Sequence, residues 1–113
     1  MTKQIDFYFD FASPNAYLSN KALKDVVERT GATINYIPVL LGGIFKLTNN
    51  QPPMMAFAGI LNKNEYQSLE MTRFIERHGI QDFQMNPHFP VITLQIMRAA
   101  TAANEDGYLS DFI

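Results

Sequence analysis

Cysteine is absent from the 113-residue sequence. Its absence excludes disulfide bonds, thiolate metal sites and a cysteine nucleophile. The sequence also lacks a strong charge of either sign, with a formal net charge of −2 and an isoelectric point near 5.5. This balance argues against nucleic acid or an anionic membrane surface as the main partner. No apolar run approaches the ~20 residues that a membrane-spanning helix requires. From the charge balance and the short apolar runs together, we expect neither nucleic acid nor a membrane among the partners of this protein.

A secretory signal is missing from the start of the sequence as well. Met1 and the three polar residues after it lead directly into an apolar stretch, whereas a signal peptide would place a basic segment and a longer apolar segment there. We therefore expect a cytoplasmic protein. The hydrophobic share of 47% is enough for a packed core, and the length corresponds to one domain at most.

The most informative segment, residues 5–18, has the pattern of a buried strand that turns abruptly into a helix. Residues 5–11 are rich in aromatic side chains, as expected for an interior parallel strand. Pro14 suits the first helical position because the N–H that it lacks would have no partner there. Ser13 then falls at the N-cap, beside the free N–H groups and the positive end of the helix dipole. Two interpretations stay open: Ser13 only caps the helix, or it also meets a phosphate, carboxylate or thiolate.

The remaining pattern predicts a β-α-β unit followed by helices. Leu18 and Val26 recur at helical spacing, and Gly31 ends that helix. A strand, a crossover helix and a second strand form a parallel pair. The predicted strands are 5–11 and 33–38, and the predicted helices are 14–29, 63–78 and 93–103, with the start of another at 108–113. In the helix at 63–78, Tyr66, Leu69 and Phe74 should face inward and Gly79 should stop the helix, and Thr93 should cap the helix at 93–103. Residues 41–53 should form a loop or broken turn, and residues 86–91 an extended link.

Three blocks of the sequence form an ordered series. They are residues 9–18 (Phe-Asp-Phe-Ala-Ser-Pro-Asn-Ala-Tyr-Leu), residues 38–45 with 50–53, and residues 86–94 with 97–100. In this order they resemble the active-site turn, the second strand with its glutathione-side loop, and part of the helical insertion of the 2-hydroxychromene-2-carboxylate isomerases. This family is related to the kappa-class glutathione transferases within the DsbA-like thioredoxin superfamily. Ile92 departs from the pattern, in which a polar residue is common.

The resemblance implies an α/β fold, a thioredoxin-like βαβ start followed by a helical insertion. Residues 1–53 would form the N-terminal βαβ part with the active-site turn and the glutathione-side loop, and residues 54–113 part of the α-helical insertion domain. A thioredoxin-like domain also needs C-terminal antiparallel strands and a C-terminal helix, and nothing after Pro38 has the pattern of such a strand. Two parallel strands do not form a stable sheet alone. We therefore expect an incomplete domain, either a fragment or a chain completed by a partner.

The resemblance also implies glutathione chemistry. Residues 13–16, Ser-Pro-Asn-Ala, stand where a DsbA-like oxidoreductase has Cys-x-x-Cys, so disulfide exchange is excluded. In the family pattern Ser13 is catalytic and donates a hydrogen bond to the glutathione sulfur, and a donor at a helix N-terminus favours thiolate over thiol. The implied reaction is a glutathione-dependent isomerisation of an aromatic-degradation intermediate by reversible thiolate addition, with glutathione as cofactor. The implied assembly is a homodimer that acts on a small aromatic substrate.

Four further residues are candidates for the glutathione site on the same resemblance: Pro14 and Asn15 in the turn, Asn50, and Lys63. Asn50 matches a position that hydrogen-bonds glutathione, although an asparagine there also suits an ordinary turn. Lys63, with Tyr66 three residues later, could face a carboxylate of glutathione or substrate, or could simply be solvated.

Other polar residues have weaker patterns. Asp6, Tyr8 and Asp10 alternate along the first strand, and paired carboxylates there could serve acid–base chemistry or structural hydrogen bonds. His78 and His88 have no metal-ligand spacing, so we expect no metal site.

Several interpretations stay open at this point. Residues 54–58, which begin with two methionines, and Met97 suit either an aromatic-substrate pocket or ordinary packing. Two other functions remain as alternatives to the isomerase: a kappa-type glutathione transferase that conjugates electrophiles, and a non-catalytic glutathione-binding or dimerisation piece. Kinship at the level of fold does not choose among them, because function resides in the site.

Overall fold

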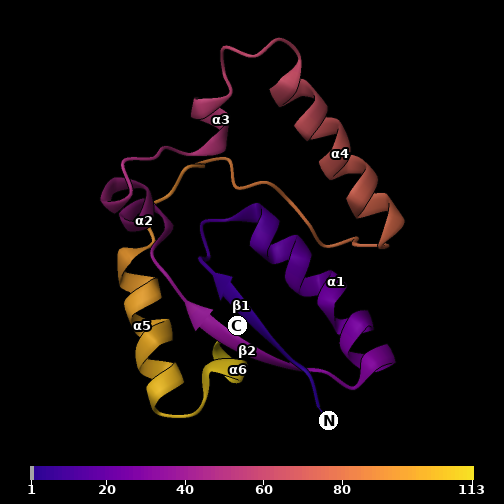
Figure 1. The fold of residues 1–113 in the computed structure, drawn as a ribbon, viewed down its shortest axis with the longest axis vertical. Coiled ribbons are helices and arrows are strands. Elements are labelled where there is room, and N and C mark those ends of the chain that lie inside the picture. Colours follow the sequence, from indigo (N-terminus) through magenta and orange to yellow (C-terminus); the bar gives the residue numbers. More distant parts are fainter. Residues whose placement is uncertain (1) are drawn as a thin grey trace. The chain divides into compact units, whose positions relative to one another are not determined.

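The computed structural model describes residues 2–113 of the chain. The chain separates into two compact units, one formed by residues up to Leu41 together with Met85–Ile113 and the other by Gly42–Gln84. These units differ from the predicted division after residue 53, which separates a thioredoxin-like part from a helical insertion. That division stays a prediction. The elements in chain order are β1 (Gln4–Phe9), α1 (Pro14–Thr30), β2 (Thr33–Pro38), α2 (Leu41–Leu47), α3 (Pro53–Ala56), α4 (Lys63–Arg77), α5 (Leu94–Glu105) and α6 (Leu109–Phe112) (Figure 1).

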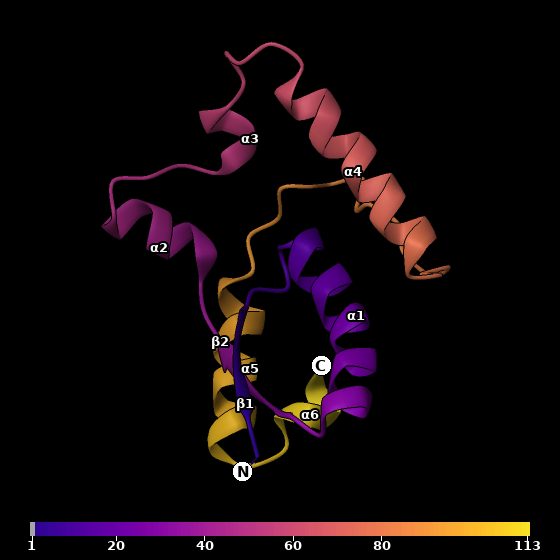
Figure 2. The same cartoon turned by 45° about the vertical axis from the view of Figure 1, so that its right-hand side comes forward.

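The start of the chain confirms the predicted βαβ unit. β1 and β2 pair in parallel, with Phe9 opposite Pro38, and form a two-stranded sheet. The strands lie side by side in both views, with α1 as the crossover between them (Figures 1 and 2). α1 begins at Pro14 and ends at Thr30. Gly31 follows with a φ of 69°, a left-handed conformation that costs a glycine little.

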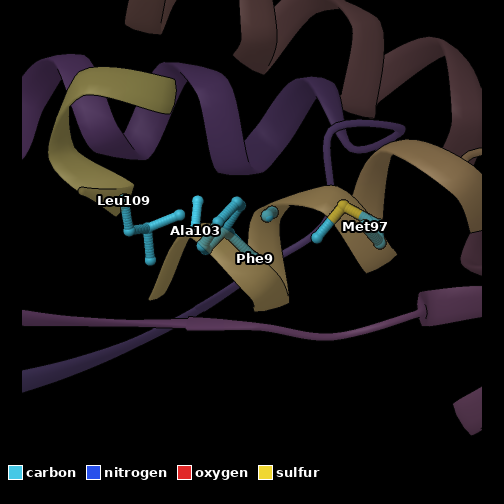
Figure 3. Close-up of a cluster of buried hydrophobic side chains, with 5 residues drawn as sticks. Phe9, Met97, Ala103 and Leu109 are labelled. Atoms are coloured by element: carbon cyan, nitrogen blue, oxygen red, sulfur yellow. The ribbon is translucent and has the colours of Figure 1, made fainter. Parts of the chain in front are cut away.

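The core lies on one face of this sheet. Alternation along β1 turns Phe7 and Phe9 toward that face and leaves Asp6 and Tyr8 exposed. The buried cluster joins β1, α5 and α6 through Phe9, Met97, Ala100, Ala103 and Leu109 (Figure 3). Ala100 and Ala103 are fully buried, and their small side chains let α5 approach the Phe9 ring closely.

Tyr36 of β2 connects the sheet to α1. Its ring meets the rings of Phe7 and Phe9 edge-on, with centroids 5.7 and 6.1 Å away. Its hydroxyl donates to Asn20 Oδ1 of α1 at 2.5 Å. Partial burial raises the pKa of Tyr36, so the phenol keeps its proton for this bond at neutral pH. Packing and a polar contact therefore act together to hold α1 over the core face.

The opposite face of the sheet is polar at its centre. Gln4 Nε2 and Asn35 Nδ2 both donate to Asp6 Oδ1, at 3.0 and 3.1 Å. These two hydrogen bonds, first the one from Gln4, hold the pKa of Asp6 below its usual value because they favour the ionised carboxylate. Tyr8 on the same face is 64% exposed.

Residues 41–47 form the helix α2, so the predicted loop over 41–53 is wrong in its first half. The prediction relied on Gly42 and Gly43, each of which costs a helix about 1 kcal/mol relative to alanine. Both glycines lie in the first turn, and the apolar residues that follow continue the helix. The rest of the prediction is confirmed near Asn49, which ends the helical stretch in a turn with a φ of 53°.

α4 confirms the next predicted helix, and Gly79 follows its end with a φ of 61°. The predicted inward face is wrong for Tyr66 and Leu69, which are 57% and 46% exposed, while Phe74 is half-buried. Within this unit only Ile80 is buried. Helical periodicity marks an apolar stripe but does not supply a partner to cover it.

The last predicted elements are present. Residues 86–91 form a link without helix or strand, tightened by a turn in which Phe89 N donates to Asn86 O. α5 starts directly after Thr93, and α6 is the short helix expected near residue 108. Every helix within residues 2–113 is too short or too polar to cross a membrane.

Candidate functional site

A tight turn over residues 10–13 leads from β1 into α1. Ser13 N donates to Asp10 O at 2.9 Å and so closes the turn. The backbone of Ser13 is extended (φ −92°, ψ 111°), and its Oγ accepts from Ala16 N at 3.1 Å. This confirms the predicted N-cap, with Pro14 as the first helical residue.

The start of α1 presents hydrogen-bond donors at the positive end of the helix dipole. Ser13 Oγ accepts one bond, and its own proton has no acceptor within residues 2–113. A hydroxyl can accept and donate at once, so Ser13 can cap the helix and still donate to a ligand. The Asn15 N–H, in the first turn, is also without a partner in the described part of the chain. The half-buried Ser13 hydroxyl and the Asn15 N–H therefore lie at the N-terminus of a 17-residue helix, a place that favours binding of an anion.

Asp10 is 3% exposed and does not share a face with the exposed Asp6. β1 ends one residue before Asp10, which breaks the alternation on which the pairing of carboxylates relied. Oδ1 accepts from Ala12 N at 2.9 Å and from Thr93 Oγ1 at 2.6 Å, and Oδ2 accepts from Leu41 N at 2.8 Å. Asp10 is therefore a structural hydrogen-bond acceptor, the second of the two interpretations of its sequence pattern.

Two residues at the start of α5 contact the turn, and the sequence predicted neither contact. Thr93 occupies the N-cap position, but its side chain makes no cap hydrogen bond, which corrects its predicted role. The hydroxyl donates instead to the Asp10 carboxylate, and a hydrogen bond to an ionised acceptor is stronger than one between neutral groups. Met97 lies with its Sδ 3.4 Å from Phe11 N. The partners are 83 and 86 residues apart, so no local pattern could reveal them.

A pocket of about 220 Å³ lies beside the same helix. Arg98 is its one charged lining residue, and Met97 belongs both to this lining and to the buried core cluster. Met97 therefore has a packing role, and its contact with an aromatic substrate stays a prediction. Met54 and Met55, in the other unit, are 53% and 63% exposed. The pocket is lined by Pro38, Val39, Leu40, Leu94, Met97, Arg98 and Thr101.

Asn50 and Lys63 belong to the second compact unit and are described within it. Asn50 is exposed, and its Oδ1 accepts from Gln51 N at 2.9 Å, as is common for an asparagine in a turn. Lys63 opens α4, and its ammonium lies 4.5 Å from the centroid of the Phe57 ring. Their role in glutathione binding stays a prediction.

Each histidine has a local contact, within one helix turn or one loop. His78 follows the end of α4, and its ring lies tilted by 40° against the ring of Phe74, with 4.3 Å between the centroids. His88 lies in the link before α5, where its backbone N–H donates to Asn86 Oδ1. Within residues 2–113, no three histidine, aspartate or glutamate side chains gather in a way that could hold a metal ion.

Comparison with known proteins identifies the family to which this turn and fold belong. Residues 4–112, nearly the whole chain, match the family described as DSBA-like thioredoxin domain. The chain belongs to the DsbA-like thioredoxin domain family. The superfamily to which the sequence blocks pointed is thus confirmed, and so is the thioredoxin-like start of the fold.

Within this family, the chain is similar to proteins named for two activities. It is 56% identical over 39 residues to a 2-hydroxychromene-2-carboxylate isomerase of Sphingobium xenophagum, covering 34% of this chain and 20% of the relative. It is 42% identical over 53 residues to glutathione S-transferase kappa 1 of Caenorhabditis elegans, covering 46% and 24%. It is 32% identical over 76 residues to a 2-hydroxychromene-2-carboxylate isomerase of Pseudomonas putida, covering 67% and 36%. The matched segments thus span well under half the length of these relatives, and no solved structure matches the chain significantly.

Proposed function

We propose that the protein is a glutathione-dependent isomerase of the 2-hydroxychromene-2-carboxylate isomerase type, acting on aromatic-degradation intermediates. The observation that carries this proposal is a half-buried Ser13 hydroxyl at the N-terminus of α1 whose proton has no acceptor among residues 2–113. A cysteine there would favour disulfide exchange, and the sequence contains none. The relatives named as isomerases support the choice of reaction.

The donors at the turn fit the sulfur of glutathione. Donors and the positive end of a helix dipole favour a thiolate over a thiol, and the Ser13 hydroxyl and the Asn15 N–H lie at such a place. Pro14 starts the helix there and so sets the position of both donors. On the family resemblance we assign Asn50 and Lys63 to the peptide and carboxylate groups of glutathione, which their amide and ammonium groups suit.

Glutathione, when bound, would supply a nucleophilic sulfur for reversible addition to a conjugated double bond; addition would turn that bond into a single bond that can rotate, and departure of the sulfur would make it double again. Ser13 would donate to the sulfur before attack and again at its departure, and would favour the ionised form at both stages. A decrease of one or two units in the pKa of the sulfur corresponds to about 1.4–3 kcal/mol. A stabilised thiolate is also the better leaving group.

A kappa-type transferase is the second candidate, because one relative carries that name and the same donors would serve conjugation. The two reactions differ in the fate of glutathione, which an isomerase returns and a transferase leaves in the product. We further propose a small aromatic carboxylate as substrate and a homodimer as the assembly.

Replacement of Ser13 in the full-length protein tests the proposal. Ser13→Ala should lower isomerase turnover roughly ten- to a hundredfold, since a hydrogen bond to a charged group is worth ~1.5–3 kcal/mol. Loss of the cap should cost only about 1 kcal/mol of folding stability. The assay follows 2-hydroxychromene-2-carboxylate with glutathione in catalytic amount, so a transferase would stop when the glutathione is consumed.

Ser19→Ala is the matched control for this test. Ser19 is exposed on the same helix as the candidate site, so its loss should leave turnover unchanged. Unchanged turnover in Ser13→Ala, at an unchanged melting temperature, would remove Ser13 from the mechanism.

A further inference from the structure

Asp10 is a buried carboxylate for which the proposed reaction has no direct use. It is 3% exposed, and its donors are neutral groups: two backbone N–H groups and one hydroxyl. Burial of a charge is costly unless several hydrogen bonds compensate for it. The three bonds to Asp10 meet that requirement, and their positions indicate what the carboxylate does.

The three donors come from separate segments of the first compact unit. Ala12 belongs to the turn just before Ser13, Leu41 follows β2, and Thr93 precedes α5. The backbone of Asp10 contributes as well, since its carbonyl accepts from Ser13 N at 2.9 Å. Residue 10 therefore holds the turn through its main chain and ties it to two other segments through its side chain.

α5 contacts the turn at a second point. Phe11 N donates to Met97 Sδ at 3.4 Å, and Met97 N in turn donates to Thr93 O at 2.9 Å. Both contacts thus come from the first turn of α5, the helix that packs against Phe9 in the core. The turn that carries Ser13 is held by the start of this helix at two places.

We propose that Asp10 is a positioning residue for Ser13 and that Thr93 acts through it. This inference rests on the proposed glutathione function. The Ser13 hydroxyl favours a thiolate only while its oxygen stays within hydrogen-bond reach of the sulfur, and such bonds weaken steeply with distance and angle. The bonds from Ala12 N and Thr93 Oγ1 to the Asp10 side chain fix residue 10. The bond from Ser13 N to Asp10 O then fixes the Ser13 backbone and with it the direction of the hydroxyl.

Thr93→Val in the full-length protein tests the inference, because it removes the donated bond, keeps the side-chain volume of residue 93 and leaves the Asp10 side chain itself in place. The measurement is the pKa of protein-bound glutathione, from the ultraviolet absorbance of its thiolate, together with kcat and KM. We expect the pKa of the bound thiol to rise and kcat to fall about tenfold, with a smaller change in KM for glutathione. Thr93→Ser keeps the hydroxyl and should restore both values.

Thr72→Val is the matched control, at an exposed position of α4. The Thr72 hydroxyl donates to Ser68 O within that helix, so neither the pKa of the bound thiol nor kcat should change. Unchanged values in Thr93→Val, or a Thr93→Ser variant that fails to restore them, would overturn the inference. If Thr93 had a purely structural role, Thr93→Val would lower the melting temperature but would change neither the pKa of the bound thiol nor kcat. This result too would overturn the inference.

Asp10→Asn separates geometry from charge. Loss of a negative charge near the site would by itself favour the thiolate, whereas a loosened turn disfavours it. We expect the pKa of the bound thiol to rise, and a lower pKa would contradict the positioning role. If Asp10→Asn does not fold, the two Thr93 variants decide alone. Ser13→Ala separates the two proposals. If the pKa of bound glutathione does not change in Ser13→Ala, the proposed function is refuted. If this pKa rises in Ser13→Ala but does not change in Thr93→Val, only the positioning role is refuted.

Discussion

A serine hydroxyl can accept one hydrogen bond while it donates another, and Ser13 uses only the first capacity within residues 2–113. Capping and ligand binding therefore do not compete for this residue, and both interpretations of its sequence position are compatible. Thr93 shows the other outcome: a residue in a capping position whose hydroxyl donates to a buried carboxylate instead. The function of a polar side chain thus depends on the strongest partner within its reach.

Asp6 offers a test at the residue scale. Gln4 and Asn35 donate to its Oδ1 and hold the pKa of Asp6 below its usual value. A lowered folded-state pKa means that these bonds stabilise the fold above the unfolded-state pKa, and that their contribution is lost as pH falls through the folded-state pKa. Asn35→Ala should therefore raise the pKa of Asp6. The variant should be less stable than the wild type at neutral pH, and this difference in stability should become smaller in acid.

An NMR titration of the Asp6 carboxyl carbon in the full-length protein measures this pKa. Asn104→Ala, at an exposed position of α5, serves as the control and should leave the Asp6 titration unchanged. An identical Asp6 titration curve in Asn35→Ala would mean that the cross-strand bond does not stabilise the carboxylate.

At the scale of elements, α5 connects the strand, the turn and the core. Its buried face consists of Met97, Ala100 and Ala103, and the same face contacts Phe9. Because two of these side chains are alanines, the helix backbone lies close to the aromatic ring, and no room is left for a larger group. The proposed positioning of Ser13 depends on this packing, since Thr93 and Met97 belong to the start of the helix.

Ala103→Leu tests the packing of α5. The added isopropyl group should overpack the core and destabilise the full-length protein by about 1–3 kcal/mol. Ala102→Leu, the next residue toward the N-terminus and exposed, should stay within about 0.5 kcal/mol of the wild type. Urea unfolding followed by circular dichroism measures both variants. Equal stability of Ala103→Leu and Ala102→Leu would show that α5 is not tightly packed on Phe9.

At the scale of the whole molecule, the chain separates into two compact units, and the two-stranded sheet belongs to the first of them. The curated relatives are much longer than the segments that match them, which cover 20–36% of their length. The division at residue 53, the missing C-terminal strands and the homodimer therefore stay predictions. The match over residues 4–112 establishes the family, and the structure shows its thioredoxin-like βαβ start.

Glutathione binding is the prediction that belongs to this scale. A ligand present at a hundred times its dissociation constant stabilises the fold by ~2.7 kcal/mol, so glutathione should raise the melting temperature of the full-length protein. S-methylglutathione, which cannot ionise at sulfur, should give a smaller shift at the same concentration because Ser13 then meets no thiolate. Equal shifts for the two ligands would place the sulfur away from Ser13, and no shift with either would contradict glutathione as the cofactor.

Local signals predicted the fold where the physics is local. The cap at Ser13, the helix start at Pro14 and the stop at Gly31 each depend on a few neighbouring residues, and the structure confirms all three. The predictions failed where a partner elsewhere decides the outcome. Tyr66 and Leu69 form part of an apolar stripe, yet both are exposed, because periodicity does not tell whether anything covers the stripe.

The sequence by itself determined the βαβ start, the place of Ser13 at the head of α1 and the family. These depend on short-range conformational preferences or on blocks of residues in a fixed order. Only the tertiary structure decided how Asp10, Thr93 and Met97 are used. Their hydrogen bonds join residues 31, 83 and 86 positions apart. A buried polar group must find its partners wherever the fold brings them, and a contact over such a separation leaves no trace in the local pattern.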